Sequence, residues 1–337
     1  MKISNRDMFP ASGTISSFQD IAPLLEQPIF DEAFKAHDKA ALRAKKLYHR
    51  FGQIAILMIA FSGIFTIAEA LLFPKLFNNI ILTLFAATMA FSGLVLQFYI
   101  MLTRQKEKWL INRYATEYIR SLKFQSFALA DQAISAEHLG ELAKNFASKR
   151  MASLENDLNA GLSILTKFLP ETVLSASANY FAADPKNNAI SQAAGEAYHE
   201  LRMTYQRNFA LSEIEKFKSR RRFFNSTQDM IYMAAAVFAL LALGGKILAY
   251  SGRVISTDWI DFTAVTLFIL GATEAIMDNA LLEEQSQARF EQYLRDLNNS
   301  DAADLSQLRE YILGTEQVCL SELGEFCRAA ERIRYRF

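Results

Sequence analysis

Two carboxylates inside an otherwise apolar segment are the strongest chemical signal in this chain. Glu274 and Asp278 lie in a stretch that runs from about Asp261 to Leu282. A spacing of four residues places both side chains on one face of a helix. An ionisable residue inside a membrane-spanning segment is costly and marks a pathway or a paired site. We interpret this face as either the wall of a water-filled path or a protonated structural pair, and both alternatives remain open.

A nearby cation does not resolve this choice. In a hairpin with its turn at residues 251–260, Lys246 lies level with about residue 265. At about 1.5 Å rise per residue, Glu274 is then roughly 13 Å deeper. Lys246 and Glu69 each lie near the end of an apolar stretch and can reach an interface instead. The acidic face therefore needs water, a proton or a partner from elsewhere.

No motif of an enzyme or cofactor site occurs in the sequence. It contains no glycine-rich phosphate loop, no G-x-S-x-G and no H-E-x-x-H. Glu196-x-x-His199 has the spacing of half a di-metal site, but a second copy is lacking. We predict a protein that is not an enzyme and that has no cofactor and no metal. We assign the basic cluster Arg220, Arg221 and Arg222 to lipid headgroups at a membrane interface.

Four apolar segments satisfy the length rule for membrane-spanning helices. They cover about residues 54–73, 80–102, 230–250 and 261–282. The fourth has the alternative of being a buried helix in a soluble bundle, because it contains the two carboxylates. With 51% hydrophobic residues and 36 basic against 36 acidic side chains, the composition excludes intrinsic disorder and argues against nucleic-acid binding. The predicted fold class is an all-α integral membrane protein with two transmembrane hairpins and long cytoplasmic helical extensions.

The distribution of positive charge predicts the orientation. Basic residues are concentrated before the first and third apolar segments and after the second, whereas the two hairpin turns carry few. We therefore expect a multi-pass protein of the bacterial inner (plasma) membrane with both termini in the cytoplasm. Cys319 and Cys327 would then face a reducing compartment as packing residues.

The chain divides into five predicted regions. An N-terminal arm covers residues 1–36, and residues 37–130 form a basic helix, the first hairpin and a helix that continues the second span without a break. A cytoplasmic helical region follows at 131–228, with Ser135 as an N-cap. The second hairpin and its exit helix occupy 229–300, and an amphipathic helix occupies 301–337. The two hairpins with their flanks have a weak internal symmetry, for which coincidence is an open alternative.

Three short motifs resemble a known family. They are the basic run Lys39-Ala-Ala-Leu-Arg43-Ala-Lys45-Lys46, the exit motif Trp109-x-x-x-Arg113-x-x-x-Glu117-x-x-Arg120, and the late segment Ile312-Leu313-Gly314-Thr315-Glu316…Glu322. Together they resemble the SLATT group of bacterial membrane proteins and the related SMODS-associating four-transmembrane effectors. The chain departs from the pattern in two ways: residues 131–228 separate the hairpins, and the Trp expected near Glu322 is absent, with Phe326 nearby.

The resemblance implies a pore-forming effector of a bacterial defence system. Such effectors permeabilise the host membrane when a sensor protein or a nucleotide second messenger triggers them, although no residue here identifies a nucleotide site. We expect a homo-oligomer in the lipid bilayer, without nucleic acid. Glu274 and Asp278 would line the path, and Trp109, Arg113, Glu117 and Arg120 would hold or transmit the cytoplasmic conformation.

The alternative is a membrane-anchored scaffold whose cytoplasmic helices bind a partner protein without conduction. A secondary transporter is less favoured, because no pair of Gly- or Pro-broken helices occurs at matched positions of the two halves.

Overall fold

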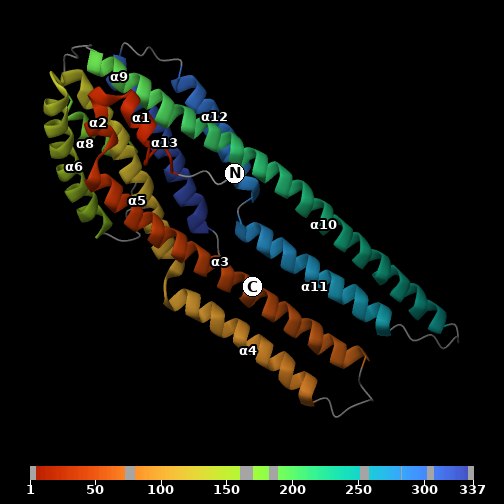
Figure 1. Cartoon of the computed structure of the whole chain (residues 1–337). Helices are drawn as coiled ribbons and strands as arrows, with labels where there is room; N and C mark the ends of the chain where they lie inside the picture. Colours follow the sequence, from red (N-terminus) through yellow and green to blue (C-terminus); the bar gives the residue numbers. More distant parts are fainter. Residues whose placement is uncertain are drawn as a thin grey trace. The chain divides into compact units, whose positions relative to one another are not determined.

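The computed structural model describes residues 5–72, 80–159, 170–181, 189–250, 258–281, 283–301 and 307–332, and every regular element in these ranges is helical. The elements before the middle region are α1 (Ser12–Ser17), η1 (Gln19–Ile21), α2 (Ala22–Leu25), α3 (Pro28–Leu72), α4 (Ile80–Leu102), α5 (Gln105–Gln125) and η2 (Ser126–Gln132). The others are α6 (Ala136–Leu158), α8 (Pro170–Ala178), α9 (Ala189–Tyr198), η3 (His199–Thr204), α10 (Tyr205–Tyr250), α11 (Asp258–Leu281), α12 (Glu283–Ser300) and α13 (Leu308–Arg332) (Figure 1).

The chain separates into two compact units. The polar unit comprises Met1–Ala44, Glu107–Phe217 and Glu284–Arg332, and the apolar unit comprises Lys45–Lys106, Lys218–Glu283 and Ile333–Phe337. The long helices α3 and α10 contribute residues to both units.

Four helices of the described chain are long and apolar enough to cross a membrane, as the sequence predicted. The apolar stretches lie within Pro28–Leu72, Ile81–Leu102, Asp229–Leu248 and Asp258–Ile276. Their large side chains are exposed in the isolated chain, for example Ile81 at 80% and Leu240 at 68%. Such surfaces suit a lipid environment, because they leave the apolar side chains in contact with hydrocarbon.

Close backbone approaches and aromatic contacts hold α3 against α4 and α10 against α11 (Figure 1). A Cβ atom added at Gly93 would lie 2.8 Å from Ile59 Cγ1 and 3.0 Å from the Ala55 carbonyl oxygen. The Phe65 and Phe85 rings meet edge to face, 4.9 Å apart. In the second pair, a Cβ at Gly271 would lie 2.8 Å from the Tyr232 ring. Small residues therefore permit both hairpins to pack closely.

The polar unit has a core of aromatic and aliphatic side chains. Tyr114, Phe124, Phe127 and Tyr198 are each at most 2% exposed. The predicted N-cap is confirmed at Ser135, whose hydroxyl accepts a hydrogen bond from the His138 backbone N–H at 3.2 Å.

Two expectations about helix boundaries are wrong. The second apolar helix does not continue without a break, since α4 ends at Leu102 and α5 begins at Gln105. Arg104 has a positive φ of 49°, a left-handed conformation that ends a helix, and its N–H bonds back to the Met101 carbonyl at 3.2 Å. The N-terminal arm is also shorter than residues 1–36, because α3 begins at Pro28, a residue preorganised for a first helical turn.

Candidate functional site

The two carboxylates of the fourth apolar segment lie on α11, and the structure describes one of their two side chains. Glu274 is half-buried within the apolar stretch of this helix. Asp278 belongs to the same helix, but its side chain lies outside the described residues. We expected Lys246 to lie too far from Glu274 and Asp278 to neutralise them. In the structure, Lys246 Nζ forms an ion pair with Asp261 at 3.0 Å.

The basic cluster Arg220, Arg221 and Arg222 lies in the middle of α10. The backbone there is helical, but the three side chains lie outside the described residues, so their assignment to lipid headgroups stays a prediction.

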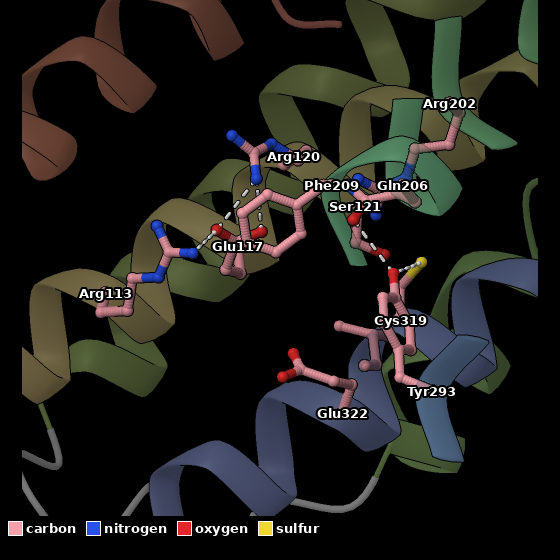
Figure 2. Close-up of a pocket in the computed structure, with 11 residues that line it drawn as sticks. Arg113, Glu117, Arg120, Ser121, Arg202, Gln206, Phe209, Tyr293, Cys319 and Glu322 are labelled. Atoms are coloured by element: carbon pink, nitrogen blue, oxygen red, sulfur yellow. Dashed lines mark hydrogen bonds and ion pairs between the residues drawn. The ribbon is translucent and has the colours of Figure 1, made fainter. Parts of the chain in front are cut away.

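The exit motif forms a ladder of ion pairs along α5 (Figure 2). Arg113 Nη2 lies 2.6 Å from Glu117 Oε1, and Arg120 Nη1 contacts both oxygens of the same carboxylate at 2.8 and 2.9 Å. The spacings of three and four residues bring these side chains onto one helix face. Trp109 is 4% exposed and packs edge to face on Phe326 of α13, with ring centroids 6.0 Å apart. The four motif residues are thus positioned by one helix, and two of its neighbours complete the site.

The first of these neighbours is the N-terminal arm. Asp7 is 2% exposed, and its Oδ2 lies 3.1 Å from Arg120 Nε. Burial raises the pKa of Asp7, although Arg120 and Arg202 both act to lower it. Burial would likewise raise the pKa of Glu117, but Arg113, Arg120 and Arg202 together bring it below its usual value. Glu117 is therefore the carboxylate that this arginine cluster holds ionised.

The second is a buried arginine in the π-helical turn η3, between α9 and α10. Arg202 is 2% exposed and donates to both carboxylate oxygens of Glu316 in α13, at 2.7 and 2.9 Å. The Tyr198 hydroxyl donates to the same carboxylate at 3.0 Å, and the guanidinium lies 5.0 Å from the centre of the Phe124 ring. π-Helical turns are frequent at functional sites, because the extra residue redirects side chains that an α-helix would place elsewhere.

A small cavity lies among these groups. It measures about 30 Å³ and is lined by polar side chains of α5, η3, α10, α12 and α13, namely Arg113, Glu117, Arg120, Ser121, Arg202, Gln206, Tyr293, Cys319 and Glu322, together with Phe209 and Leu320 (Figure 2). This volume has room for about two water molecules. The Tyr293 hydroxyl donates to Gln206 at 3.0 Å and lies 3.2 Å from Cys319 Sγ.

The cavity lacks the features of a catalytic site. Burial raises the pKa of the Cys319 thiol to about 12, so this group is not a ready nucleophile. Glu322 pairs with Arg289 at 3.0 Å, and the other carboxylates lie against arginines. In the part of the chain that the structure describes, no three His, Cys, Asp or Glu side chains gather as a metal ion requires. The arrangement is suited to fixing helices relative to one another.

Sequence reasoning missed Asp7 and Arg202. Each pairs with a residue more than a hundred positions away in sequence, and a distant partner has no periodic signal. Glu316 and Glu322 were noted only as members of the late segment that resembles the SLATT group.

No protein-family model matches this sequence, and neither a curated protein nor a solved structure matches it.

Proposed function

We propose that this chain is a multi-pass inner-membrane protein that assembles into a pore-forming effector of a bacterial defence system and opens in response to a cytoplasmic signal. The observation that carries the proposal is Glu274, a carboxylate in the apolar stretch of α11. A carboxylate in hydrocarbon is costly in free energy, and a path that contains water removes most of this cost.

Other intramembrane polar atoms support a wet or shared interior. Gln97 Nε2 on α4 and Thr266 Oγ1 on α11 are buried and have no hydrogen-bond partner among the described residues. Unsatisfied polar atoms are costly in hydrocarbon, so they favour water or a second copy of the chain as the missing partner. We therefore propose a homo-oligomer in the lipid bilayer, with Glu274 and Asp278 facing the path.

The helices that would transmit a signal are continuous with the polar unit. Both α3 and α10 run from residues of the polar unit into an apolar stretch, and α5 follows α4 after two residues. Trp109, Arg113, Glu117 and Arg120 fix α5 within the polar unit. A rearrangement of that unit would therefore act directly on the membrane helices.

The trigger is a sensor protein or a nucleotide second messenger in this proposal. The cavity of about 30 Å³ has room for about two water molecules and not for a nucleotide. A nucleotide would require another surface or a prior movement of the helices, so the present arrangement favours a protein partner.

The test is ion flux from liposomes that contain the purified chain. Glu274→Gln keeps the shape of the side chain and removes its charge. We expect cation flux to fall about tenfold, the effect of about 1.4 kcal/mol on a barrier. The double variant Glu274→Leu/Asp278→Leu should abolish it. The matched control is Glu69→Gln, which changes another carboxylate of an apolar helix. The Thr83 hydroxyl donates to Glu69 Oε1 at 2.5 Å and can donate equally well to the amide oxygen of glutamine.

Wild-type flux from the double variant would refute the acidic path. A chain that never conducts, and whose overexpression does not depolarise cells, would instead favour the membrane-anchored scaffold. In that case the apolar helices could be exchanged for unrelated spans without loss of function.

A further inference from the structure

The first described residues of the chain contact the long helices α3 and α5 and the π-helical turn η3 that precedes α10. We call Asn5–Phe9 the tip. It touches α5 through Arg120 and Lys123, η3 at the entry to α10 through Arg202, and α3 through Phe34. Two of these helices, α3 and α10, continue into apolar stretches, and the third follows α4 closely. The tip thus contacts elements of the polar unit that continue in sequence into the apolar stretches or follow them.

The contacts with α5 are polar and buried. Arg120 Nη2 donates to the Asn5 side-chain oxygen at 2.9 Å, and its Nε lies 3.1 Å from Asp7. Lys123, which is 1% exposed, donates to the Met8 carbonyl at 2.7 Å and to Asp31 of α3 at 2.8 Å. One lysine therefore joins the tip, α5 and α3.

The remaining contacts are aromatic and electrostatic. The Phe9 ring meets Phe34 edge to face at 5.8 Å, and Lys35 lies 4.6 Å above the centre of the Phe9 ring. Asp7 Oδ2 lies 3.9 Å from Arg202 Nη1, within range of an ion pair but too far for a hydrogen bond. Asp7 shares its neighbouring cations with other carboxylates, because Arg120 also pairs with Glu117, Lys123 with Asp31 and Arg202 with Glu316.

Two features make the tip separable from the rest of the arm. Asp7 Oδ2 is buried in ion-pair range of Arg120 and Arg202, yet neither carboxylate oxygen has a well-aligned hydrogen bond to a side chain among the described residues. Helix α1, which follows the tip, buries none of its residues, whereas Ile21, Leu24 and Leu25 beyond it are at most 2% exposed. The tip can therefore leave its seat while the second part of the arm stays anchored.

We propose that the tip is a releasable clasp that holds α3, α5 and the start of α10 together in the closed state, and that its departure frees these helices. The clasp itself is a property of the polar unit. Its effect on conduction rests on the proposed function.

The experiment compares two substitutions of one residue in the full chain. Asp7→Lys introduces a cation against two buried guanidiniums and should expel the tip. Asp7→Asn is the matched control, because it keeps the shape of the side chain and removes the negative charge without adding a cation. Hydrogen exchange at residues 5–9 and at the polar ends of α3, α5 and α10 reports release, and liposome flux reports opening.

We expect Asp7→Lys to accelerate exchange at all four places and to raise resting flux about 5- to 150-fold, the usual range of coupling between sites. Asp7→Asn should accelerate exchange and raise flux less than Asp7→Lys does, because it removes the ion pair with Arg120 but adds no cation.

Phe9→Ala keeps the proposal testable if Asp7→Lys does not fold. This variant removes the contacts with Phe34 and Lys35 without placing a charge in the core, and it should accelerate exchange at the tip and at α3. The proposal is overturned if a released tip leaves exchange in α3, α5 and α10 unchanged, or if Asp7→Asn releases the tip as far as Asp7→Lys does. Another outcome is a variant that releases the tip and accelerates hydrogen exchange in the helices without changing flux. If the wild type conducts, this result would show that the clasp does not gate conduction. If no variant conducts, the proposed pore fails, and the exchange data alone still decide whether the clasp exists.

Discussion

The polar and apolar units differ in where their paired charged side chains lie. In the polar unit, charged groups lie in the interior and are paired there: Arg202 and Glu316 are hydrogen-bonded twice, and Tyr198 adds a third bond to the carboxylate. In the apolar unit, described ion pairing lies near a helix end, as in Lys246 and Asp261, whose side chains are 61% and 20% exposed. Glu274 lies within the apolar stretch of α11, and this position makes it the residue on which the proposed function depends.

The difference shows how each unit obtains a defined arrangement. Water surrounds the polar unit in the proposed topology, so apolar burial drives its folding and the buried ion pairs select which helix faces meet. Hydrocarbon offers no comparable drive between apolar helices, so their packing depends on close fit. Gly93 and Gly271 provide that fit. Substitutions should therefore act through charge in one unit and through volume in the other.

The largest effect should follow from breaking the central pair of the polar unit. Arg202→Met keeps the length of the side chain but leaves Glu316 buried without its cation. Removing one partner of a buried pair costs about 3–5 kcal/mol. Unfolding is followed by the fluorescence of Trp109, which is buried against Phe326, in a Trp259→Phe background that removes the other tryptophan.

The control for this prediction is Arg207→Ala. Arg207 pairs with Asp301 at 2.8 Å, but its side chain is 40% exposed, so the expected cost is at most about 1 kcal/mol. The double variant Arg202→Met/Glu316→Leu should recover part of the loss, with the Tyr198 hydroxyl left as the remaining cost. Equal effects of Arg202→Met and Arg207→Ala would mean that burial does not distinguish the two pairs.

A smaller effect is expected from adding one methyl group to the apolar unit. In Gly93→Ala, the new Cβ would lie 2.8 Å from Ile59 Cγ1 and 3.0 Å from the Ala55 carbonyl oxygen. The backbone atom has to move, and overpacking of this kind costs about 1–3 kcal/mol. The measurement is the midpoint of heat-induced loss of the monodisperse protein in detergent.

Gly244→Ala provides the matched comparison, because no atom lies within 4 Å of a Cβ at that position of α10. Alanine is favoured over glycine in a helix by about 1 kcal/mol, so this variant should hold or raise the midpoint. If both alanines had the same effect, close packing at Gly93 would not be what holds α3 against α4.

The two units also differ in how much of them the sequence predicts. Apolar length is a local property, and all four apolar helices were predicted close to their observed places. The ladder of Arg113, Glu117 and Arg120 and the Ser135 cap depend on spacings within one helix, and both were predictable for that reason. The contacts of the tip were not predictable, because those of Asp7 with Arg120 and of Met8 with Lys123 join residues about a third of the chain apart. The break at Arg104 was missed because a left-handed arginine has no signature in composition.

The smallest effect should come from the ion pair at the end of the second hairpin. Lys246→Gln removes the cation that lies 3.0 Å from Asp261. Exposed pairs contribute about 0.2–1 kcal/mol, so the midpoint of unfolding should fall only slightly. Flux should be unchanged, because Lys246 is engaged by Asp261 and not by the acidic face deeper in α11. A large loss of flux in this variant would place Lys246 in the path with Glu274, and charge in the apolar unit would then be organised through the membrane as it is in the polar unit.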